Sequence, residues 1–366
     1  MACSLSLLAA VLPPERFDTL LHYYHGGGVD ISGPSLLLRK GLGQSASMSA
    51  NYYVDAVSSA SIDVITSATP YHERRVEKDL GFDYLRDKVT LGLNVKRSDE
   101  NDYKANTIGF NIARDMFGDL TTVSLGYTRA RDTVGKRDQP DFSEHVRRQN
   151  YVLGLSQIFT KNLVVNLNWE TITDEGFLNN PYRSVRYLDL SSPVGYSFQP
   201  EVYPRTRDSN AVAVRANYYL PYRAAVHGQY RFFTDSWGIR ANTYEIGYTH
   251  PTRDRWTFDL TYRRYKQNHA DFYSDLFPQI DAQNFLARDK ELSAFTNHAI
   301  GMTASYELAV AKWGLIDKGS INFSYDHIRF DYDDFRDISR SGFLPGEEPL
   351  YGFSADVLQL YLSLWY

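Results

Sequence analysis

The final residues of the chain alternate between two kinds of side chain, and this pattern constrains the fold more than any other. One face of the segment carries Leu358, Leu360, Leu362, Leu364 and Tyr366, and the other carries Val357, Gln359, Tyr361, Ser363 and Trp365. A period of two is typical of a β-strand, and about nine to eleven tilted residues cross the core of a bilayer. The segment therefore predicts a membrane-spanning strand, although a soluble β-sandwich can also end this way. An aromatic last residue is typical of outer-membrane barrels, so we interpret the apolar face, from Leu358 to Tyr366, as an assembly signal.

The same rhythm recurs along most of the chain. Segments of about ten alternating residues are separated in turn by tight turns and by longer polar stretches. Lipid on one side and a polar interior on the other explain this pattern, whereas a sandwich would need a second apolar layer to cover the polar face. The sequence predicts an all-β fold, a single transmembrane antiparallel up-and-down β-barrel of about 16 strands. Fourteen is the alternative, because segments 17–24 and 31–40 alternate poorly.

Composition agrees with one membrane barrel. No apolar stretch of about twenty residues is present and mean hydropathy is −0.41, which excludes a helical membrane protein. Aromatic residues make up 14% of the chain, as expected if they form girdles at the two membrane interfaces. Tyr84 and Trp256 fall beside short turns, whereas Tyr52 and Trp169 fall toward long connections. An even strand count predicts a bacterial outer-membrane protein with both termini in the periplasm.

Charge and cysteine content exclude several function classes. The 39 basic and 44 acidic residues are interspersed and give a net charge of −5, so no basic stripe indicates nucleic-acid binding. The single cysteine excludes an intrachain disulfide, a Cys-x-x-Cys zinc site and covalent haem attachment. The nine histidines lack metal-binding spacing. We expect no metal and no cofactor.

The amino-terminal segment has a different character from the strands. Residues 3–12 resemble the apolar core of a secretory signal, but no basic region precedes them and no Ala-x-Ala site follows. We interpret residues 1–14 as a signal-peptide remnant and residues 15–366 as the barrel with long extracellular loops. The alternative is a lipoprotein acylated at Cys3.

Charged residues recur on the polar faces of the predicted strands. Those expected to point into the lumen are Glu73, Arg75, Glu77, Asp79, Arg215, Arg231, Glu245, Asp259 and Arg263. They predict either a polar pathway that selects what passes or a ladder of ion pairs that stiffens the interior. The bulky inward residues Tyr53, Tyr265, Tyr361 and Trp365, with a proline-containing loop over 171–208 that folds inward, predict a narrow lumen.

No catalytic motif is present. Gly26-Gly27-Gly28 lacks the Lys and Ser/Thr of a phosphate-binding loop, and no Gly-x-Ser-x-Gly elbow occurs. Asp326 and His327 are adjacent in a strand and so point to opposite faces. The acidic stretch 331–337 indicates a solvated loop more than a calcium site. We therefore predict no catalytic residue.

Several motifs carry a family resemblance. Residues 52–64 (YYVDAVSSASIDV) and 71–75 (YHERR), followed by 117–122 (FGDLTT), 235–239 (DSWGI) and 271–275 (DFYSD), resemble the bacterial family catalogued as domain of unknown function 3570. The resemblance implies an outer-membrane barrel whose relatives are found beside a small lipoprotein, thioredoxin-like proteins and a flavin transferase. It carries over no catalytic residue.

Together these patterns predict a non-enzymatic transport or conduit component of the outer membrane. Its expected partners are outer-membrane lipid and the barrel-assembly machinery, and the resemblance adds a small lipoprotein and a periplasmic redox protein of a redox- or flavin-linked system. Two alternatives stay open. One is an outer-membrane enzyme with an unrecognised site on the rim, and the other is a structural barrel that anchors a lipoprotein.

Overall fold

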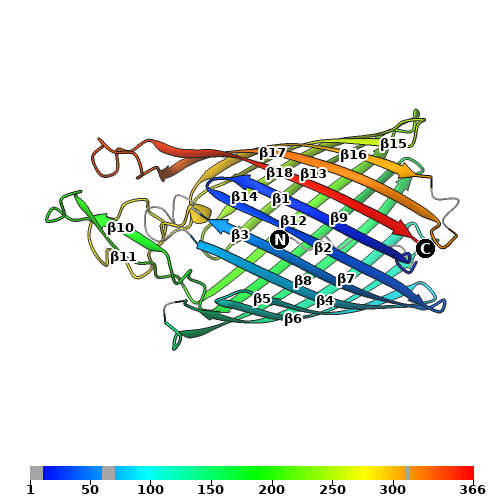
Figure 1. Cartoon of the computed structure of the whole chain (residues 1–366), viewed down its shortest axis with the longest axis horizontal. Helices are drawn as coiled ribbons and strands as arrows, with labels where there is room; N and C mark the ends of the chain where they lie inside the picture. Colours follow the sequence, from blue (N-terminus) through cyan, green and yellow to red (C-terminus); the bar gives the residue numbers. More distant parts are fainter. Residues whose placement is uncertain (1–10, 60–70, 138, 310–313) are drawn as a thin grey trace.

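Sixteen antiparallel strands close into one barrel in the computed structural model, which describes residues 11–59, 71–137, 139–309 and 314–366 (Figure 1). Neighbours in the sheet are neighbours in the chain, except that β9 pairs with β12 and the first strand pairs with the last. The strands are β1 (Arg16–Gly26), β2 (Val29–Leu42), β3 (Ala46–Ser59), β4 (Tyr71–Arg86), β5 (Val89–Asp99), β6 (Tyr103–Met116), β7 (Thr121–Gly135), β8 (Ser143–Thr160), β9 (Leu163–Gly176), β12 (Thr206–Tyr219), β13 (Ala225–Asp235), β14 (Arg240–Pro251), β15 (Trp256–Gln267), β16 (Phe295–Leu308), β17 (Lys318–Arg336) and β18 (Leu350–Trp365). The predicted closed barrel of 16 strands is confirmed. Residues 1–10 of the predicted signal remnant lie outside the described part.

The alternative of fourteen strands is wrong, because segments 17–24 and 31–40 form β1 and β2. Leu21 and Leu36 are exposed on the outside of the barrel. Leu20 and Leu37, one position away, face inward opposite Ser35 and Asp18. Leucines on both faces blur the sequence alternation although both strands pair along their length.

The outer surface of the barrel is an apolar belt. Large exposed hydrophobic side chains occupy every second position of the strands, and the positions between them carry mostly polar or small residues. Leu80 and Ile246, each 61% exposed, are typical members of the belt. A water-filled or polar interior and a lipid exterior require this division. No helix in the described ranges is both long and apolar enough to span a membrane.

The predicted tight turns are confirmed as the connections at one end of the barrel. Phe117, Asp119 and Arg223 adopt positive φ angles of 53°, 67° and 70° there, and such backbone is rare outside turns for residues other than glycine. The strands at the other end run further than the sequence indicates, since β7 ends only at Gly135 and β17 at Arg336. Backbone pairing continues past the apolar belt because each hairpin keeps satisfying its own N–H and C=O groups.

The seam between the first and last strands is closed by a complete ladder. Arg16 pairs with Trp365, so the two described ends lie at the end of the barrel that carries the short turns. On the outer face four residues from four adjacent strands stand in one row, in the order Asp30, His25, Asp356 and His327. His25 Nδ1 lies 2.7 Å from Asp30 Oδ1, and His327 Nδ1 lies 2.9 Å from Asp356 Oδ1.

The predicted assembly signal lies on this closing strand. Leu358 and Leu360 project outward from β18 and are exposed, and Leu362 and Leu364 share their face. Tyr366 follows the strand, and its hydroxyl donates to the backbone oxygen of Arg39 at 2.9 Å. Recognition of these residues during assembly stays a prediction.

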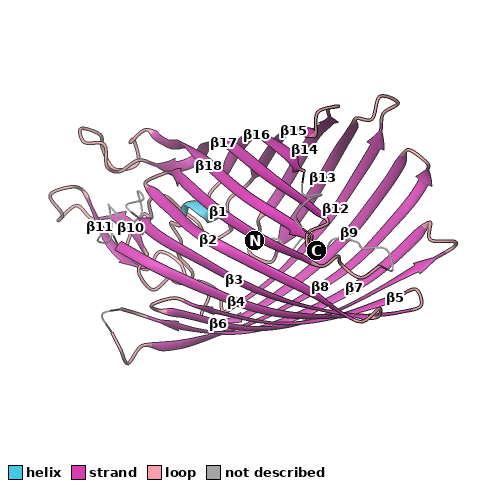
Figure 2. Cartoon of the chain, turned by 45° about the vertical axis from the view of Figure 1, so that its right-hand side comes forward, coloured by secondary structure: helices cyan, strands magenta, loops and turns pink. Residues whose placement is uncertain are grey.

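At the opposite end three long connections pack together into a platform, which we define as residues 177–205, 268–294 and 337–349. It contains the hairpin β10 (Ser184–Leu188) and β11 (Tyr196–Pro200) and the short 3-10 helix η1 (Lys290–Leu292). Val185, Phe277 and Leu286 form one buried cluster in it. The hairpin lies beyond the ends of the barrel strands (Figures 1 and 2) and bridges to the second connection at Phe277. This differs from the predicted inward fold of 171–208, because burial of Val185 holds the hairpin against its neighbouring loops.

Candidate functional site on the lumen wall

The nine predicted lumen charges all occupy inward positions of their strands. On β4, Leu80 and Phe82 belong to the outer belt, so Arg75 and Glu77 face the interior. On β14, Tyr244 and Ile246 face outward, which turns Glu245 inward. The same alternation places Glu73, Asp79, Arg215, Arg231, Asp259 and Arg263 on the lumen face.

One group of these charges lies on β4 and its neighbouring strands. Arg75 stands opposite Asp55, and its Nη2 lies 2.8 Å from Asp55 Oδ2. His22 Nε2 contacts the other oxygen of Asp55 at 2.7 Å. Lys96 Nζ lies 2.9 Å from Glu77 Oε1. Glu73 and Asp79 form no ion pair within the described residues.

A second group lies on β12 to β15, on another arc of the barrel. Glu245 accepts at 3.2 Å from His227 Nε2 and lies 3.7 Å from Arg215 Nη1. Arg231 Nη2 lies 3.4 Å from Glu170 Oε2. These contacts support the ion-pair ladder among the predicted alternatives, since opposite charges compensate one another on each arc.

The two remaining lumen charges of this arc are Asp259 and Arg263. Thr249 donates its hydroxyl to Asp259. Arg263 stands directly opposite Glu245 and lines a cavity of about 220 Å³ together with Asp326. Asp326 and its neighbour His327 do point to opposite faces, because His327 contacts Asp356 on the outside.

Polar side chains on the lumen wall lie flat over glycines of the next strand. Asn111 is opposite Gly92, and a Cβ added to Gly92 would lie 2.2 Å from Asn111 Oδ1. Asn94 covers Gly109 in the same way, at 2.1 Å. The other such pairs are Ser49 over Gly81, His227 over Gly247 and Asp326 over Gly301. His22 covers Gly33 more loosely, since a Cβ there would meet the backbone oxygen of Val54 at 1.7 Å and His22 Cε1 at 3.3 Å. We call these six pairs the glycine shelf. A glycine in a strand commonly marks a site of close approach, and here the approach keeps polar side chains off the barrel axis.

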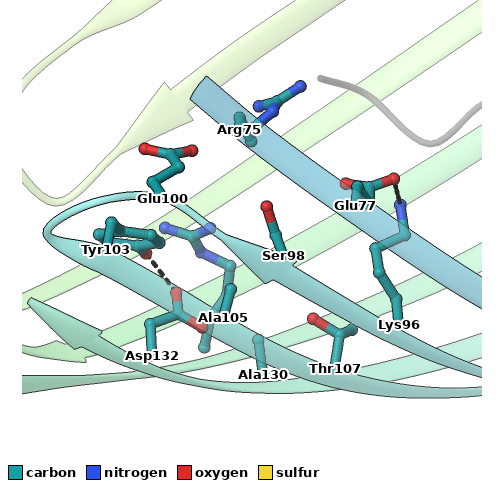
Figure 3. A pocket seen from close by; sticks show the side chains of 11 residues that line it. Arg75, Glu77, Lys96, Ser98, Glu100, Tyr103, Ala105, Thr107, Ala130 and Asp132 are labelled. Carbon is teal, nitrogen blue, oxygen red and sulfur yellow. Dashed lines mark hydrogen bonds and ion pairs between the residues drawn. The ribbon is translucent and has the colours of Figure 1, made fainter. Parts of the chain in front are cut away.

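A second wall cavity, of about 210 Å³, lies over β4 to β8 (Figure 3). Arg75, Glu77, Lys96, Asp132 and Arg148 line it, and Glu100 and Tyr103 close its end beside the turn that joins β5 to β6. Tyr103 donates its hydroxyl to Asp132 Oδ2. Burial, followed by repulsion from Glu73, raises the pKa of Glu100 to about 7.

The sequence did not identify several of the residues that line this cavity. Glu100 and Asp132 stand in stretches that read as polar connections, where inward and outward positions are hard to assign, and no sequence motif singles out Arg148. Asp55 lies on the polar face of its alternating segment, but its pairing with Arg75 depends on strand register. Which residues face each other across two strands depends on the strand register, and the register is set partly by the length of the turn between the strands.

A family model described as "Protein of unknown function (DUF3570)" matches residues 32–327. The chain belongs to this family. Both arcs of lumen charge in this DUF3570 barrel fall within the matched range. No curated protein matches the sequence.

Solved structures similar to the DUF3570 barrel are outer-membrane barrels. A bacterial polysaccharide outer membrane secretin has a TM-score of 0.50 at 6% identity, over 96% of this chain and 98% of that one. The outer-membrane protein OmpT of Vibrio cholerae has a TM-score of 0.46 at 9% identity, over 96% of both chains. OccK2 of Pseudomonas aeruginosa, solved in complex with glucuronate, has a TM-score of 0.43 at 10% identity, over 97% and 99%. The secretin likeness shows the fold, which is that of a bacterial outer-membrane barrel.

Proposed function

We propose that this barrel is a non-enzymatic conduit for small polar solutes across the outer membrane. The glycine shelf is the observation that carries the proposal. It holds hydrogen-bonding groups of Asn94, Asn111 and Asp326 against the wall, where they line a path without crossing it. A barrel that served only as an anchor would need no polar side chains held against its wall, because its interior could be filled with side chains at ordinary protein packing density.

The shelf also bears on the predicted width of the lumen. Tyr53 was expected to add inward bulk, but its ring stacks on His22 with centroids 5.0 Å apart and planes 3° apart. His22 itself covers Gly33. The bulk of this pair therefore lies along the wall. A narrow lumen stays a prediction. The inward bulk of Tyr53 no longer supports it as strongly.

Planar-bilayer recording of the purified barrel tests the conduit. We expect discrete, reproducible current steps in potassium chloride and faster swelling of liposomes in small polar solutes. Silence in both assays, with a correctly folded barrel, would contradict a conduit that works alone. Steps that appear only with a partner would favour a gated component.

The proposal also includes the partner proteins and the orientation of the barrel in the membrane. The family resemblance supports a small lipoprotein and a periplasmic redox protein, and the paired ends of β1 and β18 support periplasmic termini if the short turns face that side. Cross-linking of the native barrel in outer membranes, followed by identification of stoichiometric partners, tests both. Protease access to a tag placed after Tyr366, in intact and in permeabilised cells, tests the orientation.

A further inference from the structure

The cavity over β4 to β8 holds carboxylate oxygens that no protein group satisfies. Asp132 is 3% exposed. Its Oδ2 accepts from Tyr103, whereas Oδ1 has no hydrogen-bond partner among the described residues. The side chain of Glu100, at the end of the same cavity, makes no hydrogen bond or ion pair within the described ranges. Leaving a buried acceptor unpaired is costly, and more so when it is charged.

The cationic side chains that line the cavity already form ion pairs. Arg75 Nη2 lies 2.8 Å from Asp55, Lys96 Nζ lies 2.9 Å from Glu77, and Arg148 Nε lies 2.6 Å from Asp174. Arg75 Nε is a buried donor without a partner among the described residues. The charges that act on Glu100 are the carboxylates of Glu73, Asp102 and Asp55 and the single guanidinium of Arg75. Within the described residues, Glu100 and Asp132 are therefore the carboxylates of the cavity that lie in no ion pair.

We propose that this cavity binds the ammonium or guanidinium group of a small organic cation. The inference rests on the proposed conduit, because it names the class of solute that the lumen wall would select. A cationic N–H group that reaches Asp132 Oδ1 or Glu100 would supply the missing donor, and charge-assisted bonds of this kind are strong. The ring of Tyr103 offers a face for the same cation.

A metal ion fits this cavity less well than an organic cation. No three histidine, cysteine, aspartate or glutamate side chains of the described residues converge as a bound metal requires. The cavity volume of about 210 Å³ also exceeds the space of a single ion. An alkyl ammonium fills more of it and needs only two acceptors.

Calorimetric titration of the detergent-folded barrel with 1,4-diaminobutane tests the proposal. We expect saturable binding, with no binding of the neutral analogue 1,4-butanediol. Asp132→Asn and Glu100→Gln should each raise Kd by about tenfold or more, which is the loss of one charge-assisted bond. Asp119→Asn is the matched control, because Asp119 pairs with Lys88 in a short turn at the other end of the barrel.

Several outcomes would overturn the site. These are no saturable binding of the diamine, equal binding by Asp132→Asn and the wild type, or tighter binding of calcium that the same substitution abolishes. Glu100→Gln changes a residue between strands, so it keeps the test valid if Asp132→Asn misfolds. Binding is measured without conduction, so the two proposals fail separately. Diamine binding by a silent barrel would oppose the conduit alone, and conduction without binding would overturn the cation site alone.

Discussion

Arg186 and Glu348 form a bidentate ion pair that joins two long connections far apart in the chain. Arg186 Nη1 and Nη2 donate to the two carboxylate oxygens of Glu348 at 2.5 and 3.0 Å. Arg186 is 0% exposed and also donates to Asp275. The pair thus ties all three connections of the platform into one unit.

Glu348→Gln should loosen this platform. Removing one partner of a buried ion pair costs about 3–5 kcal/mol, because the remaining charge stays buried. We expect faster proteolysis within 177–205 and 337–349 while the barrel itself stays folded. Arg340→Gln is the control, since its pair with Asp337 is exposed on the arginine side and surface pairs contribute little. Equal cleavage rates for the two variants would contradict the role of the pair.

Gly92→Val should move Asn111 off the wall and into the lumen. The new side chain would collide with the amide end of Asn111, which can turn away into the lumen, so we expect a smaller loss of stability than the roughly 1–3 kcal/mol of overpacking in a closed core. We expect lower single-channel conductance from a barrel that still folds. Gly228→Val is matched to it, because a Cβ at Gly228 meets nothing within 4 Å. If both variants conduct like the wild type, the glycine shelf does not set the width of the path.

The two faces of β18 make a direct test of the barrel. Leu360 is 48% exposed in the apolar belt, so Leu360→Arg should lower the free energy of unfolding by about 2–4 kcal/mol near the bilayer midplane. Gln359→Arg places the same charge in the lumen and should cost far less. Urea titration in lipid vesicles measures the free energy of unfolding of both variants. The gel mobility of unboiled samples reports the folded fraction at each urea concentration. Equal losses would mean that the faces are reversed.

The current through the barrel should become more cation-selective as pH rises from 6 to 8. Glu100 has a pKa raised to about 7, so it is protonated and neutral below this pH and negative above it. The groups around it are Asp55, Glu73, Arg75, Asp102, Tyr103, Asp132 and Arg148. Reversal potentials in a potassium chloride gradient report the change, and Glu100→Gln should flatten it. An unchanged pH response in that variant would assign the effect to another group.

The sequence predicts what depends on one strand at a time. The outward positions of Leu358 and Leu360 and the inward positions of Arg75 and Glu245 follow from alternation alone, and the structure places them so. Contacts between strands depend on register, which no local pattern reveals. For that reason Asn111 over Gly92 and Asp132 beside Tyr103 could not be predicted.

The packing of the platform was harder to predict from the sequence than the lumen wall. Arg186 and Glu348 are separated by 162 positions, and each stands in a stretch that reads as a solvated loop. Their burial comes from the packing of three connections on one another. The sequence therefore predicted long, separate loops where the structure has a packed unit.

The ladder between β1 and β18 also sets an order of events during biogenesis. Arg16 meets Trp365, so the first strand cannot find its permanent neighbour until the last has been translated and exported. Until then both strands expose unpaired backbone groups, which attract other strands. Any sheet that forms before this closure has two open edges, and both edges are removed in one step when β1 and β18 pair.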